Sequence, residues 1–230
     1  PLCYYVRKVV GPARMMILFV DYGHRTAEYE WWCLQRVAEE LRCELRRIDM
    51  RWLGEISTSL LTKAGVPVPE TRPEDIQRPE EARRRILRWW DPCRNGLLLL
   101  AGLAFAESWH LRDGIISDVY IGIRRETPVP MKDNTPEFLE KVNELVPWVT
   151  HYGAYRCLAP FIHLDKPSVI RLGQALGVNW LYTYSCYAGA GWTSDGLPIH
   201  CGTCSNCRRR RMAFREAGVE DPSVYAKSPD

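Results

Sequence analysis

The sequence predicts an α/β fold in which a doubly wound parallel sheet carries helices on its faces. Short runs of β-branched, aromatic and aliphatic residues alternate with longer segments whose apolar residues recur at spacings of three and four. The run Met16–Val20 is entirely apolar, as expected of a strand that is buried on both faces of a parallel sheet. Asp21 follows it directly, and such sheets bind ligands beyond the carboxyl ends of their strands.

Strands and helices can be placed from these patterns. The predicted strands are Tyr4–Val10, Met16–Val20, Cys43–Ile48, Gly114–Ile121 and Trp180–Tyr184. The clearest helix begins at Thr26, because its apolar positions from Tyr29 to Leu41 share one face. The other predicted helices are Leu53–Lys63, Pro79–Trp90, Gly96–His110, Thr135–Val146, Lys166–Leu176 and a basic segment that ends at Gly218.

Composition argues against several classes of protein. The 230 residues carry a net charge of +3, which gives no reason to expect nucleic acid as a partner. No apolar run reaches the roughly 18 residues of a membrane span, and the run Leu97–Ala106 is expected to be a buried helix. The chain starts without a basic and then apolar signal segment, and its nine cysteines are an odd number. A reducing cytoplasm is therefore the expected location.

Four cysteines have the spacing of a zinc site. Cys201, Cys204 and Cys207 follow one another at intervals of three, and Cys186 lies upstream after a predicted strand. Zinc takes four such ligands in a tetrahedron, and a closed set of four protein ligands is structural rather than catalytic. Free or redox-active cysteines are the alternative, and His200 is an alternative fourth ligand. We prefer Cys186, because His200 adjoins Cys201 and the geometry would be strained.

Several motifs occur in a fixed order along the chain. Asp21-Tyr22-Gly23 follows a buried strand, and Pro92-x-Arg94-Asn95 opens an apolar helix. The later motifs are Asp133-x-x-Pro136-Glu137-Phe138, Pro160-x-x-x-Leu164-x-Lys166, Ile170-Arg171-Leu172-Gly173, Thr183-x-Ser185-Cys186-Tyr187 and the cysteine triplet. In this order and spacing, from about Tyr5 to Gly218, the chain resembles the 7-cyano-7-deazaguanine synthase family.

The resemblance implies a fold and a reaction. The fold is that of the adenine-nucleotide α-hydrolases: a Rossmann-like parallel five-stranded sheet with helices on both faces, over residues 1–180, and a C-terminal zinc-binding helical subdomain, over residues 181–230. The reaction is ATP-dependent adenylation of 7-carboxy-7-deazaguanine, followed by attack of ammonia. A second activation then dehydrates the amide to 7-cyano-7-deazaguanine, a nitrile precursor in queuosine biosynthesis.

The resemblance also implies roles for individual residues. Lys166 and Arg94 would be catalytic cations at the phosphates, where charge develops. ATP with Mg²⁺ would be bound by Asp21, Tyr22, Gly23, Arg25 and Asn95. The deazaguanine would be bound by Asp133, Glu137, Phe138 and Tyr187, with Asp133 accepting from its N–H groups and an aromatic ring stacking on it. Each role has a structural alternative: Lys166 starts a helix, Asp133 caps one, and Phe138 belongs to a core.

The chain departs from the family pattern at its expected ligand face. The family's Ser-Gly-Gly-x-Asp-Ser phosphate loop does not occur between Val10 and Gly11, where a parallel crossover would usually need about a dozen residues. We expect either that residues are missing at this point or that the protein has lost ATP chemistry. The loop Gly122–Lys132, with Arg124, Arg125 and Glu126, also differs from the family.

Three functions remain open from sequence. The first is the synthase itself. The second is a divergent ligase, of the type found beside antiviral defence genes, that transfers the activated acyl group to an amine on a protein. The third is a non-catalytic module that is held together by zinc. The family often forms homodimers, and the pairs Trp31-Trp32 and Trp89-Trp90 would suit such an interface.

Overall fold

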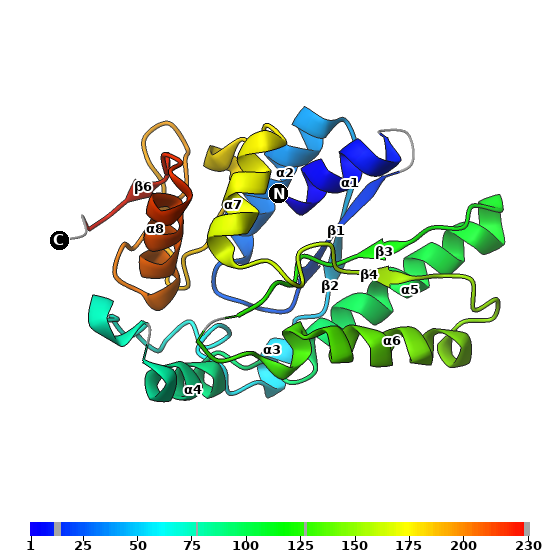
Figure 1. Ribbon diagram of the computed structural model, residues 1–230, viewed down its shortest axis with the longest axis horizontal. Coiled ribbons are helices and arrows are strands. Elements are labelled where there is room, and N and C mark those ends of the chain that lie inside the picture. The colour runs from blue at the N-terminus through cyan, green and yellow to red at the C-terminus, as the bar shows by residue number, and fades with distance from the viewer. Residues whose placement is uncertain (12–14, 77, 127, 228–230) are drawn as a thin grey trace. The chain divides into compact units, whose positions relative to one another are not determined.

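The computed structural model describes residues 1–11, 15–76, 78–126 and 128–227 (Figure 1). Its helices are α1 (Leu2–Val10), α2 (Ala27–Leu41), α3 (Trp52–Ile56), α4 (Pro79–Arg88), α5 (Arg94–Asp113), α6 (Pro136–Val149), α7 (Lys166–Ala175) and α8 (Ser205–Ala217). Its 3₁₀ turns are η2 (Pro73–Asp75), η3 (Lys132–Asn134) and η4 (Trp180–Tyr182). Its strands are β1 (Met16–Asp21), β2 (Glu44–Asp49), β3 (Val119–Tyr120), β4 (Cys157–Leu158), β5 (Ile199–His200) and β6 (Val224–Tyr225). Helices mixed with parallel strands confirm the predicted α/β class.

The chain divides into two compact units. The first unit contains Cys3–Pro92 and the chain from Lys166 onward. The second unit contains Cys93–Asp165. Each unit has its own buried apolar cluster. The resemblance implies a further boundary near residue 180, between the α/β domain and a zinc-binding subdomain. This boundary stays a prediction.

In the first unit, β1 and β2 form a parallel pair with α2 as their connection. The register runs from Met16 opposite Glu44 to Asp21 opposite Asp49. α2 buries Cys33, Val37 and Leu41 on one face, as its periodicity predicts. The carboxyl ends of β1 and β2 therefore lie at one edge, with Asp21 beside Asp49.

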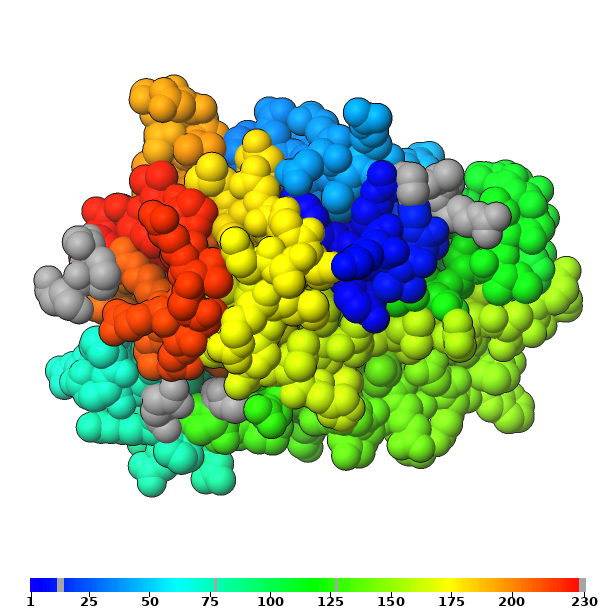
Figure 2. All heavy atoms as spheres, turned by 45° about the horizontal axis from the view of Figure 1, so that its top comes forward, coloured from blue at the N-terminus to red at the C-terminus, as the bar shows by residue number. Residues whose placement is uncertain are grey.

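Helices α7 and α8 complete the core of the first unit. They lie side by side, and α7 lies between α1 and α8 in both views (Figures 1 and 2). Ile170 of α7 and Phe214 of α8 pack in one buried cluster with Ile17 of β1. Gly173 permits a close approach here, because a Cβ at this position would lie 2.5 Å from the Trp180 ring.

The second unit packs α5 and α6 against the short parallel pair β3–β4. Its core contains Leu99, Leu103, Val146 and Cys157. Gly102 allows α5 to approach β3, because a Cβ would lie 2.5 Å from Cγ1 of Val119. Asn143 of α6 accepts from the Cys157 backbone N–H at 2.8 Å and donates to the Cys157 carbonyl at 2.9 Å. These bonds tie the helix to the edge of β4.

The strands differ from the prediction in how they assemble. Over the described ranges they form three separate two-stranded parallel pairs, β1–β2, β3–β4 and β5–β6. A five-stranded sheet is not resolved. Two of the pairs, β3–β4 and β5–β6, have only two residues in each strand.

The predicted strand Tyr4–Val10 is wrong, because this segment is helix α1. Tyr4 and Val6 are buried, whereas Val9 is 60% exposed. The Tyr4 hydroxyl accepts from the Asn179 N–H at 3.4 Å. Packing against the core of the first unit thus overrides the local β propensity of valine and tyrosine, and Gly11 ends the helix with φ of 84°.

Two further strand predictions need correction. Trp180–Tyr184 is not a strand: residues 180–182 form η4, where the Asn179 side chain accepts from the Leu181 N–H. The predicted strand Gly114–Ile121 is shorter in the structure, where only β3 remains. Its first residue, Gly114, ends α5 in the left-handed region, and Ile116 is exposed. Both segments have strand-like composition, but local hydrogen bonds of a turn and a helix cap replace the hydrogen bonds of a strand.

The corrected α1 also changes the interpretation of the missing phosphate loop. The expectation of missing residues between Val10 and Gly11 rested on two successive parallel strands. Because Leu2–Val10 is a helix that leads into β1, no parallel crossover has to fit there. Residues 12–14 of this link lie outside the described residues.

Candidate functional site

The carboxyl end of β1 forms a tight turn around Asp21. The Asp21 side chain is buried, accepts from the Gly23 N–H at 3.0 Å, and accepts from Arg47 Nη2 at 2.8 Å. Gly23 has φ of 78°, a conformation that glycine adopts without strain. Arg47 of β2 also pairs with Glu28 at the start of α2. The Asp21 carboxylate therefore shapes this edge.

Contacts among Tyr22, His24 and Glu30 continue this edge. The Tyr22 ring stacks on His24 with centroids 4.1 Å apart. His24 is buried, and its Nε2 lies 3.3 Å from Glu30 Oε2. Glu30 also accepts from the Thr26 hydroxyl at 2.8 Å. These contacts hold Tyr22 in place beside the Asp21 turn.

Arg25 organises the loop that follows α3. Its guanidinium donates to the carbonyls of Ala64 and Val66, both at 2.8 Å. The Arg25 N–H donates to the Leu61 carbonyl at 2.8 Å. The predicted nucleotide-binding arginine is therefore engaged with backbone oxygens, and it positions residues 60–66 next to the end of β1.

The second unit brings together Arg94, Asn95 and Asp133. Asn95 is buried at the start of α5, and its Nδ2 donates to the Asp133 carbonyl at 3.2 Å and to Asn134 Oδ1 at 2.9 Å. Asp133 Oδ1 is buried and has no hydrogen-bond partner among the described residues. Burial raises the pKa of Asp133, the nearby Arg94 charge lowers it in part, and the Glu126 charge raises it.

The two other predicted substrate residues of this unit follow Asp133 in α6. Thr135 caps the helix by accepting from the Phe138 N–H at 3.2 Å. Phe138 is half-buried and packs against both apolar clusters of the unit. Glu137 is exposed in the first turn. Phe138 therefore contributes to the packing of this unit, and its contact with a substrate stays a prediction.

Lys166 and Tyr187 lie in the first unit. Lys166 begins α7. The Tyr187 ring packs against Trp89, with centroids 4.5 Å apart, and Trp89 is itself buried. The structure thus places Lys166, Tyr187 and the Asp21 turn in one unit, and Arg94, Asn95, Asp133, Glu137 and Phe138 in the other.

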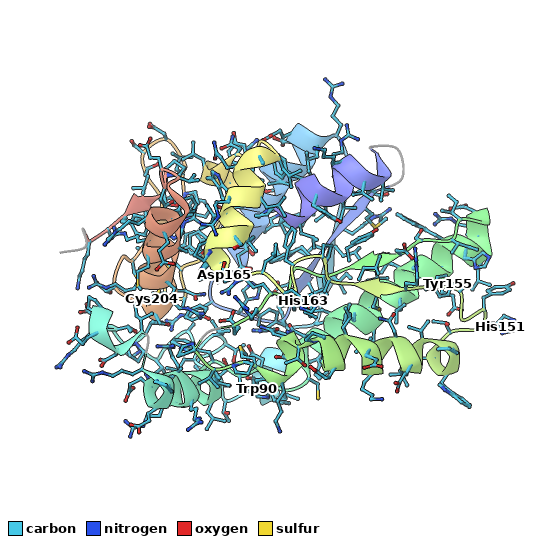
Figure 3. All side chains as sticks on the ribbon, viewed as in Figure 1. Trp90, His151, Tyr155, His163, Asp165 and Cys204 are labelled. Atoms are coloured by element: carbon cyan, nitrogen blue, oxygen red, sulfur yellow. The ribbon has the colours of Figure 1, made fainter. Side chains whose placement is uncertain are left out.

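The four predicted zinc ligands come together in the first unit. The sulfur atoms of Cys186, Cys201, Cys204 and Cys207 lie within 4.8 Å of one another, and those of Cys201 and Cys207 are 3.9 Å apart. A tetrahedral zinc with Zn–S bonds of about 2.3 Å separates its sulfurs by about 3.8 Å. Cys204 caps the start of α8 (Figure 3), and all but Cys201 are almost completely buried.

The chemistry of this cluster fits a dication. Backbone N–H groups of Ala188 and Cys201 donate to the Cys186 sulfur, both at 3.3 Å, which favours a thiolate. The pKa of Cys201 is lowered because Cys186, Cys204 and Cys207 all share hydrogen bonds with its sulfur. The pKa of Cys207 is raised by its own hydrogen bonds with the sulfurs of Cys186, Cys201 and Cys204. Without a cation, four adjacent sulfurs cannot all be ionised, whereas a zinc ion would hold four thiolates.

His200 is not part of the cysteine cluster. Its side chain is buried between the rings of Tyr184 and Tyr225, with centroid distances of 4.4 and 5.2 Å. Burial, aided by the Arg210 charge, lowers the pKa of His200 to about 3. The neutral imidazole is therefore a core residue, and the geometry favours Cys186 as the fourth ligand.

A family model decides where this chain belongs. The model of the queuosine biosynthesis protein QueC matches residues 3–218, which is nearly the whole chain. The chain belongs to the QueC family.

Relatives from three genera support the QueC assignment over most of the chain. The 7-cyano-7-deazaguanine synthase of Methanothermobacter thermautotrophicus is 35% identical over 206 residues, which cover 89% of this chain and 85% of the relative. That of Pyrococcus horikoshii is 34% identical over 219 residues, which cover 94% and 88%. That of Methanococcus maripaludis strain C5 is 34% identical over 211 residues, which cover 89% and 85%.

Some contacts around the predicted site residues could not be found from sequence. Arg47 pairs with Asp21, and Trp89 supports Tyr187, across separations that no local motif links. Arg124 and Glu126 form an ion pair at 2.9 Å with both side chains largely buried. The sequence does single out these two residues, because they lie in the loop Gly122–Lys132 that departs from the family pattern, but it does not show that they pair.

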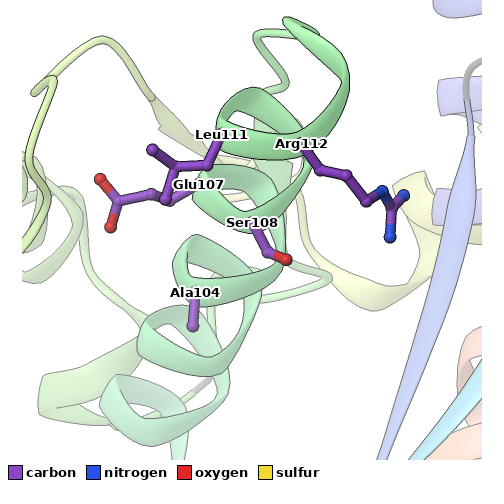
Figure 4. A pocket seen from close by; sticks show the side chains of 5 residues that line it. All are labelled: Ala104, Glu107, Ser108, Leu111 and Arg112. Atoms are coloured by element: carbon purple, nitrogen blue, oxygen red, sulfur yellow. The ribbon is translucent and has the colours of Figure 1, made fainter.

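The second unit also has a hollow on its surface. A hollow of about 480 Å³ lies along α5, lined by Ala104, Glu107, Ser108, Leu111 and Arg112 (Figure 4). No predicted site residue lines this hollow. Among the residues that the structure describes, no helix combines the length and apolarity needed to cross a bilayer.

Proposed function

We propose that this QueC-family enzyme is a 7-cyano-7-deazaguanine synthase. ATP adenylates the carboxylate of 7-carboxy-7-deazaguanine with release of pyrophosphate. Ammonia displaces AMP to give the amide, and a second ATP activates the amide oxygen. Loss of that oxygen with AMP, together with the amide protons, leaves the nitrile.

One observation in the structure carries this proposal: the buried, unpartnered Oδ1 of Asp133. A buried acceptor without a donor costs about 1–3 kcal/mol, so a fold retains it where a ligand supplies the donor. The exocyclic amine and ring N–H of a deazaguanine are such donors. Arg94 lies close enough to lower the pKa of this carboxylate, so a cation for the acyl phosphate is present in the same unit.

The residues proposed to bind the nucleotide lie in the first unit. MgATP binds at the carboxyl end of β1, where Asp21, Gly23 and Arg25 shape the turn and Tyr22 offers a ring. Lys166 at the start of α7 serves the phosphates, since pyrophosphate departure develops negative charge. In the second unit, Phe138 offers a ring face to the deazaguanine, and Glu137 lies in the same helical turn. In the first unit, the Tyr187 ring stays a predicted aromatic contact.

The four cysteines hold a structural zinc. A bound Zn²⁺ would stabilise the fold of the segment from Cys186 to α8, and its four thiolate ligands leave no open position for chemistry. The protein acts as a homodimer in this proposal. Light scattering at micromolar concentration tests that point, and a monomer contradicts it.

An assay with purified protein tests the reaction. Incubation with MgATP, ammonia and 7-carboxy-7-deazaguanine should yield the nitrile, AMP and pyrophosphate, all measurable by liquid chromatography and mass spectrometry. AMP and pyrophosphate formation that depends on the deazaguanine but gives no nitrile would point to another acceptor, such as an amine on a protein. Absence of any deazaguanine-dependent ATP consumption would refute the proposal.

A further inference from the structure

Asn95 uses both hydrogens of its amide on the Asp133 segment. It is 6% exposed, and its Nδ2 donates to the Asp133 carbonyl at 3.2 Å and to Asn134 Oδ1 at 2.9 Å. An asparagine amide has two N–H donors, so neither remains for a phosphate or an adenine.

Within the described part of the chain, the other hydrogen bonds of the Asp133 segment are those of local turns. The Asn134 N–H donates to the Met131 carbonyl at 3.0 Å, and the Thr135 hydroxyl donates to the Lys132 carbonyl at 3.1 Å. These bonds span three residues each and form η3 and the cap of α6. The two bonds from Asn95 come from 38 and 39 residues away. They join this turn to α5.

The position of Asn95 also sets the distance between two charges. Arg94 precedes it in the first turn of α5, and the Arg94 charge acts on the Asp133 carboxyl. Because Asn95 binds the backbone of Asp133, it determines where the unpartnered Oδ1 lies relative to the guanidinium. A shift of about 1 Å in such a group is enough to cost a large factor in binding or rate.

We propose that Asn95 is a positioning residue for Asp133, holding the substrate-binding carboxylate in place, and donates no hydrogen bond to the nucleotide. This inference rests on the proposed deazaguanine site. It replaces the ATP contact that the family resemblance implies for Asn95. Loss of the Asn95 side chain should therefore weaken binding of the deazaguanine and leave binding of ATP unchanged.

Steady-state kinetics of the zinc-loaded full chain separates the two roles. Asn95→Ala should raise the KM for 7-carboxy-7-deazaguanine about tenfold, equivalent to about 1.4 kcal/mol, while the KM for ATP stays within about twofold. Asn95→Asp has the same shape, but it places a carboxylate oxygen, which cannot donate, next to two acceptor oxygens. The KM for the deazaguanine should therefore rise more than in Asn95→Ala. A raised KM for ATP with an unchanged KM for the deazaguanine would overturn the inference.

Asn143→Ala is the matched control for simple destabilisation. Asn143 is in the same unit and also binds backbone through its amide, to Leu139 and Cys157. This variant should lower the melting temperature and leave both KM values unchanged below it. If Asn95→Ala behaves in the same way, its role is only structural and the inference fails.

Binding without turnover separates this inference from the proposed function. Calorimetry with 7-carboxy-7-deazaguanine alone should give an about tenfold weaker Kd for Asn95→Ala than for the wild type. If the wild type binds the deazaguanine but makes no nitrile, the proposed function fails and this comparison still decides the role of Asn95. If the wild type binds no deazaguanine, both fail.

Discussion

The Arg210 guanidinium lies against the Asp221 carboxylate in an almost closed environment. Nε is 3.1 Å from Oδ1, and the two side chains are 3% and 11% exposed. Arg210 also donates to Thr183 Oγ1 at 2.9 Å, and its charge lies over the Phe214 ring. One arginine of the basic run 208–211 is thus a core residue, not part of a solvated face.

Removal of either partner of this pair should be strongly destabilising. Asp221→Ala leaves a buried guanidinium uncompensated, for which about 3–5 kcal/mol is expected. Urea unfolding monitored by tryptophan fluorescence measures the loss. Arg215→Ala, an exposed arginine of the same helix, is the control and should change stability by less than about 0.5 kcal/mol. Equal effects of the two substitutions would contradict this account.

The same carboxylate should contribute to acid sensitivity. Burial by itself would raise the pKa of Asp221, but the Arg210 charge and bonds from Tyr225 and Ser223 lower it below 3.8. A depressed pKa adds stability above the unfolded value, and this stability is lost as the pH falls through the folded value. Melting temperatures from pH 7 to pH 2 should therefore fall less steeply for Asp221→Asn than for the wild type. Parallel curves would argue against this role.

Zinc removal should unfold part of the first unit before it affects chemistry. Structural zinc can supply on the order of 10 kcal/mol of folding free energy, so Cys204→Ser should lower the melting temperature first and the activity as a consequence. Zinc content by mass spectrometry and melting by calorimetry check this. Cys93→Ser, at an exposed cysteine, should keep its zinc. A well-folded, inactive Cys204→Ser protein with full zinc content would exclude a structural role.

The Asp133 carboxylate should lower the stability of the fold at neutral pH and increase the affinity for the substrate. Because burial raises its pKa, the ionised form costs folding free energy at neutral pH, and this cost vanishes as the pH falls below the unfolded value near 3.8. Asp133→Asn should therefore melt higher than the wild type at pH 7, with no such gain at pH 3. Its affinity for 7-carboxy-7-deazaguanine should fall about 10- to 100-fold, since charge-assisted bonds are lost.

The pH dependence of the wild type gives a second measurement of Asp133. Deazaguanine affinity should fall as the pH drops through the raised pKa, because a protonated carboxyl accepts from N–H donors poorly. Calorimetric titration across acid pH checks this. A Kd that is independent of pH, or an Asp133→Asn protein of unchanged affinity, would show that the carboxylate does not bind the substrate.

Gly102 should be intolerant of a side chain because of one neighbour. A Cβ there would lie 2.5 Å from Val119 Cγ1, so Gly102→Ala should cost about 1–3 kcal/mol by overpacking. Adding Val119→Ala should recover part of the loss. Gly96→Ala in the same helix meets no atom within 4 Å and should be neutral or stabilising by up to about 1 kcal/mol. Chemical denaturation of all four proteins tests the set.

Local patterns predicted those elements whose partners are close in the chain. Met16–Val20 and Cys43–Ile48 are strands nearly as predicted, because they flank a single amphipathic helix and form one parallel pair. The cysteine triplet also acts locally, since its spacing of three suits a turn at the start of a helix. Two of the failures, Tyr4–Val10 and Trp180–Tyr184, have strand-like composition but pack against elements far away in the sequence.

By itself the sequence determined the α/β class, the four-cysteine cluster and membership of the QueC family, because these depend on residue type, order and short spacings. Only the tertiary structure decided what the charged and polar groups do. Arg47 satisfies Asp21, Arg25 holds a loop, Arg210 is buried with Asp221, and Asn95 holds Asp133. The physical reason is that a polar group's role depends on which partner reaches it after burial. Those partners lie 11 to 41 residues away in the chain, where no local pattern connects them.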